Sequence, residues 1–173
     1  MKNLDLNLKA VVESRSDIGT LLSKPGDAVI IQRGQPRWMM LKCPCGCGED
    51  IPINLDRRAG KAWRYYQGGD KGVTLYPSVW RDTGCESHFI VWRGRILLMG
   101  GYVDDDASSV PDLPDLIRRV RMSWPSGVMI SYVDVADKLG EIPWDVLEAC
   151  RHLTREDVFV EGSGQQRAMF RRR

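Results

Sequence analysis

The feature that most constrains the fold of this chain is a short run in which three cysteines alternate with proline and glycine. The run reads Cys43-Pro44-Cys45-Gly46-Cys47-Gly48. Glycine accepts the positive φ angles that turn backbone amides toward sulfur, and proline stiffens such a turn. A lone free cysteine is often a small buried hydrophobe, but three of them in a glycine-rich turn would pack poorly in a core. The run therefore predicts a metal-binding turn.

A second pair of ligand types, Cys85 and His88, begins 37 residues after the end of the first run. The candidate metal ligands are thus five: Cys43, Cys45, Cys47, Cys85 and His88. Tetrahedral zinc takes four ligands, so three cysteines with His88 form the expected set, and the choice among the first three cysteines stays open. An iron–sulfur cluster is the alternative cofactor, although a Rieske-type cluster has two histidine ligands and this segment offers one.

Charge is unevenly distributed along the 173 residues, although the net charge is only +2. Residues 24–100 hold twelve Lys and Arg against seven Asp and Glu, and an acidic run follows at residues 104–106. We therefore expect a metal-binding domain over residues 1–103, a linker over 104–111 and a second domain over 112–173. No apolar stretch predicts a secretion signal or a membrane span, so we expect a cytoplasmic protein in which disulfides are rare.

The first domain has the periodicity of β-strands. Alternating apolar residues predict a half-buried strand over residues 3–12, and a short helix is expected over 17–22. Further strands are expected over 28–32, 38–41, 51–55, 73–76, 88–92 and 95–99. A hairpin turn is expected at Arg93-Gly94. These patterns predict a small antiparallel β domain of the zinc-ribbon or Rieske-like kind, within an α+β chain.

The second domain is predicted to be a winged helix-turn-helix. Asp112 is expected to start a helix, a short strand follows at 128–130, and Ser131 begins a capping box for the next helix. A third helix is expected from Pro143, and a hairpin over 158–170 closes the domain.

Two features of the third helix bear on the role of this domain. Cys150 falls in its apolar stripe, so we expect a core residue without a metal role. The helix also carries Asp145, Glu148 and Arg151, a net charge of −1, whereas a helix that enters DNA should be basic. Nucleic-acid binding and protein docking both stay open.

Three motifs within residues 24–100 resemble those of a cysteine-rich bacterial family. They are the run 43–49, Leu75-Tyr76-Pro77-Ser78-Val79, and Cys85-Glu86-Ser87-His88-Phe89. Genes of that family often lie in operons with ubiquitin-like proteins and their activating and conjugating enzymes, some linked to phage defence. The resemblance implies protein partners of that kind. This chain has Trp80 where the family tends to have glycine after the second motif.

Residues around the second ligand pair also invite an enzymatic interpretation. Ser78 and Ser87 are candidate nucleophiles, with Asp82 or Glu86 as an acidic partner. A metal-activated water with Glu49 or Glu86 as base is a further possibility. However, His88 cannot serve both as a metal ligand and as a free base, and Ser87 should face away from His88 on a strand.

The sequence thus favours a zinc-binding accessory or interaction protein of a bacterial ubiquitin-like conjugation or defence system. A metal- or serine-dependent peptidase acting on ubiquitin-like conjugates is the first alternative. A metal-stabilised DNA-binding regulator is the second.

Overall fold

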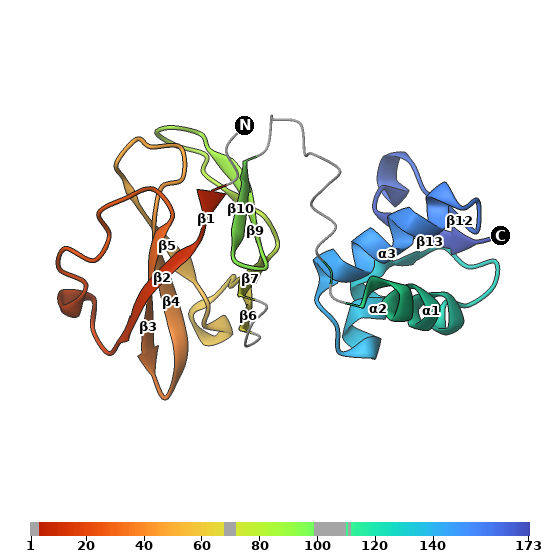
Figure 1. Cartoon of the computed structure of the whole chain (residues 1–173), viewed down its shortest axis with the longest axis horizontal. Helices are drawn as coiled ribbons and strands as arrows, with labels where there is room; N and C mark the ends of the chain where they lie inside the picture. Colours follow the sequence, from red (N-terminus) through yellow and green to blue (C-terminus); the bar gives the residue numbers. More distant parts are fainter. Residues whose placement is uncertain (1–3, 68–71, 99–109, 111) are drawn as a thin grey trace. The chain divides into compact units, whose positions relative to one another are not determined.

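The computed structural model describes the whole chain except residues 1–3, 68–71, 99–109 and 111 (Figure 1). The chain divides into two compact units, residues 1–103 and 104–173. Both strands and helices are present, so the predicted α+β class is confirmed. Apart from Val110, the predicted linker over 104–111 lies outside the described residues.

A four-stranded sheet forms one half of the first unit. Its strands are β2 (Asn7–Val12), β3 (Asp27–Arg33), β4 (Gln35–Lys42) and β5 (Asp50–Asn54), in that order. The β2–β3 pair is parallel, whereas β3–β4 and β4–β5 are antiparallel. The sheet is therefore mixed, and its parallel pair was not anticipated from the sequence.

The helix predicted over residues 17–22 is wrong. The segment instead contains a single 3₁₀ turn, Arg15–Asp17. The Ser14 side chain accepts from the Ser16 backbone N–H, and the Asp17 carboxylate accepts from the Ser14 backbone N–H. This reciprocal capping closes one turn, and Gly19 then takes a φ of 49°, which no α-helix allows.

The second half of this unit contains another sheet and a separate hairpin. The sheet order is β1 (Leu4–Asp5), β10 (Arg95–Leu98), β9 (His88–Trp92) and β8 (Val79–Trp80). The hairpin pairs β6 (Arg64–Gln67) with β7 (Val73–Tyr76). The predicted turn between β9 and β10 is confirmed, and both Arg93 and Gly94 have the positive φ that a two-residue hairpin turn requires.

One main core joins these pieces, because alternate residues of every larger strand point into it. Its fully buried members include Ile30, Met39, Leu41, Ile53, Leu75, Phe89, Val91 and Ile96. The opposite face of the β2–β5 sheet carries a smaller cluster, in which Val29, Ile31 and Met40 are covered by Ile18 and Leu22 of the loop before β3. Both faces of the central strand β3 are thus buried, which explains its continuous apolar run.

The described residues of the second unit form three α-helices and a small sheet. In chain order its elements are α1 (Leu113–Ser123), β11 (Ile130–Ser131), α2 (Tyr132–Leu139), α3 (Pro143–Arg155), β12 (Phe159–Glu161) and β13 (Met169–Arg172). The strand order is β11-β13-β12. This is the element order expected from the sequence, while the assignment as a winged helix-turn-helix stays a prediction.

Local signals in the second unit act largely as expected. The Ser131 hydroxyl accepts from the Val133 N–H, and Gly140 ends α2 in the left-handed conformation. Asp112 precedes α1 but makes no side-chain cap. Cys150 is fully buried, and burial raises the pKa of its thiol above its usual range. Cys150 is therefore a core residue, as predicted.

None of the described helices combines the length and the apolar character needed to cross a membrane.

Candidate metal centre and serine–histidine pair

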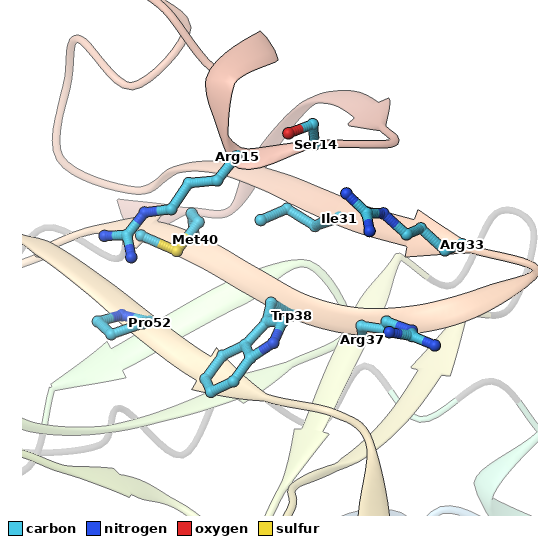
Figure 2. Close-up of a pocket in the computed structure, with 8 residues that line it drawn as sticks. All are labelled: Ser14, Arg15, Ile31, Arg33, Arg37, Trp38, Met40 and Pro52. Atoms are coloured by element: carbon cyan, nitrogen blue, oxygen red, sulfur yellow. The ribbon is translucent and has the colours of Figure 1, made fainter. Parts of the chain in front are cut away.

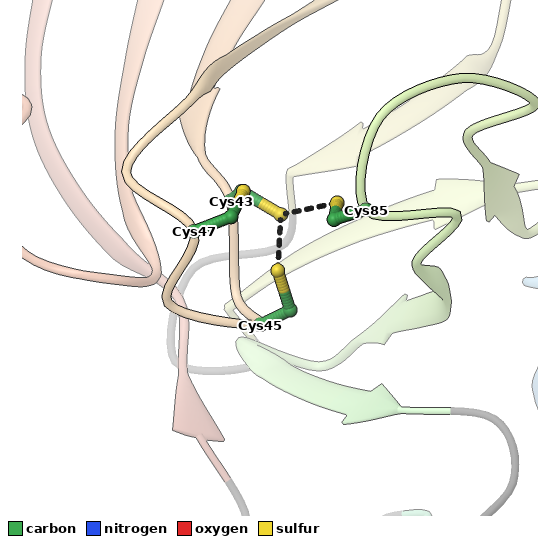
Figure 3. A group of neighbouring side chains, drawn as sticks. All are labelled: Cys43, Cys45, Cys47 and Cys85. Atoms are coloured by element: carbon green, nitrogen blue, oxygen red, sulfur yellow. Dashed lines mark hydrogen bonds between the residues drawn. The ribbon is translucent and has the colours of Figure 1, made fainter.

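The sulfur atoms of Cys43, Cys45, Cys47 and Cys85 come together in the first unit (Figure 3). All four lie within 4.8 Å of one another. The Cys43 sulfur is 3.2 Å from that of Cys45 and 3.6 Å from that of Cys85. Four sulfurs bound tetrahedrally at about 2.3 Å from zinc would be about 3.8 Å apart. The group therefore has the donor chemistry and roughly the size of a four-thiolate metal site.

The turn after β4 presents its three cysteines because glycines reverse the backbone between them. Gly46 and Gly48 have φ angles of 88° and 85°. The Cys43 N–H donates to the Glu49 carbonyl at 2.8 Å, which closes the turn at its base. Cys43 is thereby buried at the end of β4, while Cys45 and Cys47 stay exposed in the turn.

Hydrogen bonds distinguish the thiols electrostatically. The Ser87 hydroxyl, and then the Ser87 backbone N–H, lower the pKa of the Cys85 thiol to about 6. Although Cys45 is exposed as a residue, desolvation of its sulfur, followed by the hydrogen bond with the Cys43 sulfur, raises the pKa of its thiol to about 12. Arg81 adds positive charge, because its Nη1 is 3.7 Å from the Cys85 sulfur and also pairs with Glu49. The surroundings of Cys85 thus favour its thiolate, the form that binds metal.

Ser87 faces the cysteines rather than the open surface. Its side chain is buried, with Oγ 3.4 Å from the Cys43 sulfur and 3.3 Å from the Cys85 sulfur. Glu86, by contrast, is exposed and has a positive φ of 51°. The sequence suggested both as catalytic candidates, but the structure places Ser87 against the sulfurs and Glu86 at the surface.

Ser78 and His88 form a hydrogen bond of 2.9 Å between the serine Oγ and the histidine Nε2. The pairing of β8 with β9 explains this contact. Val79 is opposite Phe89 and Trp80 is opposite His88, so Ser78 is diagonal to His88 on the same face. Val79 and Phe89 point the other way, into the core. Strand alternation therefore directs the serine and the histidine toward each other.

Two tryptophans surround this pair. The Trp63 indole N–H donates to the Ser78 carbonyl at 3.3 Å, which fixes the backbone at the serine. Trp80 is 70% exposed, and its ring centroid is 6.0 Å from that of His88. Among the described residues, no carboxylate hydrogen-bonds the other ring nitrogen of His88, and Ser78 with His88 is referred to as the serine–histidine dyad.

The structure shows which of two alternative partners His88 contacts. His88 was counted among the five metal-ligand candidates, yet the four converging ligand atoms are all sulfurs, and Nε2 of His88 is directed to Ser78. Because Ser87 and His88 are adjacent on an extended segment, one faces the cysteines and the other faces the serine. The dyad was missed as the leading interpretation because β8, only two residues long, has no periodicity to reveal its pairing.

Part of the first unit is similar in sequence to a known protein family. Residues 14–99, just under half of the chain, match the sequence model of the bacterial ubiquitination-like system serine protease family, BubE. This segment includes both the four-cysteine cluster and the serine–histidine pair. No curated protein and no solved structure matches the chain.

Proposed function

We propose that this protein is a serine hydrolase that cleaves the amide bond formed by the carboxyl end of a ubiquitin-like protein. The observation that carries the proposal is the 2.9 Å hydrogen bond between Ser78 Oγ and His88 Nε2. The similarity of residues 14–99 to a family named as a serine protease of bacterial ubiquitination-like systems supports both the reaction and the class of substrate.

In the proposed reaction, Ser78 Oγ attacks the carbonyl carbon as His88 Nε2 takes the hydroxyl proton. The tetrahedral intermediate collapses, His88 gives the proton to the leaving amine, and the C–N bond breaks to leave an acyl-serine. Water then attacks the acyl-serine with His88 again accepting a proton, and Ser78 recovers that proton as the acid product leaves. The net reaction consumes one water and produces an acid and an amine.

Zinc is the metal that the four-sulfur group fits best. Cys43, Cys45, Cys47 and Cys85 would hold it, and four protein ligands leave no open position for substrate. Such an ion supplies structure rather than reaction chemistry. It would tie the turn after β4 to the segment that enters β9, only three residues before His88. The cluster would therefore help to hold the base in place.

The dyad favours a hydrolase over the accessory role that the sequence favours. A partly exposed histidine at hydrogen-bond distance from a serine hydroxyl can act as the base that activates the serine as a nucleophile. An interaction protein needs no such pair. The metal-dependent alternative is less well supported, because Glu49 pairs with Arg81 and Glu86 is exposed.

A DNA-binding role for the second unit has less support than protein docking. Arg155 pairs with Glu148 at 3.0 Å, and Arg173 pairs with Asp157 at 2.7 Å. These contacts neutralise part of the positive charge on α3 and at the end of the chain, and phosphate binding depends on such charge. We propose that this unit binds a protein component of the same system.

The test is hydrolysis of a ubiquitin-like protein fused through its carboxyl end to a reporter peptide. Ser78→Ala and His88→Ala should each lower kcat/KM by about 10²- to 10⁴-fold. His152→Ala, which removes the chain's other histidine, and Ser16→Ala, which removes an exposed serine hydroxyl, are the matched controls. Circular dichroism and metal content should be unchanged in Ser78→Ala, and labelling by a fluorophosphonate probe should require Ser78. Full activity of Ser78→Ala would overturn the proposal.

A further inference from the structure

The outer face of the β2–β5 sheet carries a cleft that the proposed chemistry does not use (Figure 2). Its volume is about 440 Å³. The residues that line it are Ser14, Arg15, Ile31, Arg33, Arg37, Trp38, Met40 and Pro52. They come from β3, β4, β5 and the capped turn that follows β2.

The floor of the cleft is apolar because two cross-strand pairs lie next to each other. Ile31 is opposite Trp38 on β3 and β4, and Met40 is opposite Pro52 on β4 and β5. Ile31 and Met40 are nearly buried, whereas Trp38 is 38% exposed. The loop before β3 covers one part of this sheet face and leaves this part open to a ligand.

The remaining wall of the cleft is strongly basic. Arg15, Arg33 and Arg37 line it, and no Asp or Glu is among the lining residues. Within the described part of the chain, none of these arginines forms an ion pair with a carboxylate. Arg33 donates only to the Glu13 backbone carbonyl, and the buried Nε of Arg37 has no hydrogen-bond partner. Arg37 also lies close enough to Asp56 to help lower the pKa of that carboxyl, but Asp56 already pairs with Arg58. Three guanidinium groups that form no salt bridge within the described residues, beside an apolar floor, are complementary to an anion that carries an apolar neighbour.

We propose that this cleft binds an acidic peptide segment of a protein partner. A carboxylate would accept hydrogen bonds from Arg33 and Arg37, which flank the β3–β4 turn, and an adjacent apolar side chain would cover Trp38 and Pro52. The floor favours a peptide over single-stranded nucleic acid, because Trp38 is its one aromatic ring and successive bases need several stacking platforms. This inference does not depend on the reaction proposed at Ser78.

A random nonapeptide display library, selected on the immobilised full chain, tests the proposal. Selected peptides should be enriched in Asp or Glu next to an apolar residue. A synthetic peptide of that kind, measured by fluorescence anisotropy, should bind at least about tenfold more tightly than its Asn or Gln isostere, because charge-assisted hydrogen bonds are lost in the isostere. Arg33→Gln and Arg37→Gln should weaken binding by a similar factor.

The control variant is Arg57→Gln, which removes an exposed arginine that does not line the cleft. It should leave peptide affinity unchanged, and Ser78→Ala should do the same. Selection without acidic enrichment, equal affinity for the acid and its amide isostere, or binding that survives Arg37→Gln would overturn the proposal. Tighter arginine-dependent binding of a fluorescent oligothymidine than of the peptide would also overturn it, in favour of nucleic acid.

Discussion

Replacing Ser87 by alanine tests the proposal that the four-cysteine cluster holds zinc. The Ser87 hydroxyl is buried and lies within 3.4 Å of two sulfurs, those of Cys43 and Cys85. Groups that hydrogen-bond metal ligands typically change metal affinity by 10- to 100-fold. Because the Ser87 backbone N–H still bonds Cys85 after the substitution, we expect about 30-fold weaker zinc binding, or about 2 kcal/mol.

The assay is competition for zinc with a chromogenic chelator, using protein prepared without metal and refilled with one equivalent. Cys43→Ala should abolish competitive binding, whereas Ser78→Ala should match the wild type because Ser78 faces His88 instead of the sulfurs. Equal zinc affinity in Ser87→Ala and the wild type would refute the inferred role of the hydroxyl. Failure of the wild type to bind zinc stoichiometrically would refute the four-thiolate zinc site itself.

Three further predictions follow from single side chains. Trp80→Ala should raise KM for the proposed substrate about fivefold with little change in kcat, because the exposed ring beside His88 would offer that substrate an apolar contact. A fall in kcat alone would show that Trp80 positions the histidine instead. Gly72→Ala should lower the free energy of unfolding, measured by urea titration, by more than about 2 kcal/mol. The added Cβ would lie 2.8 Å from the Gly94 nitrogen, and the φ of Gly72 is +65°. Gly34→Ala, which has a similar φ but open space around the added Cβ, should lower the free energy of unfolding by less. The Arg58 side chain, followed by its backbone N–H, lowers the pKa of Asp56 from 3.8 to about 2, so Asp56 should stabilise the folded state above pH 4 and lose this effect as the pH falls toward 2. The stability gap between wild type and Asp56→Asn should therefore shrink over that range, and a constant gap would contradict the assignment.

For the adjacent residues Ser87 and His88, the sequence predicts their relative orientation but not the partner of each. Strand alternation predicted that they would face opposite ways, and the structure agrees: one contacts sulfurs and the other contacts Ser78. The sequence could not tell which side would receive the metal ligands. That depended on the Cys85 segment lying against the turn at Cys43, which is a contact across 42 residues.

The sequence by itself determined most strands of the first unit, the cysteine-rich turn and the burial of Cys150, because these depend on local periodicity and on the backbone freedom of glycine. It also predicted the helices of the second unit from caps and apolar stripes. It did not predict β6 or β8. Tertiary structure alone decided that four sulfurs converge, that His88 pairs with Ser78, and that arginines gather beside Trp38. Each of these depends on contacts between segments that are far apart in the sequence. The register of a short strand such as β8 is set by the packing of Val79 and Phe89 in the core rather than by any pattern within the strand itself.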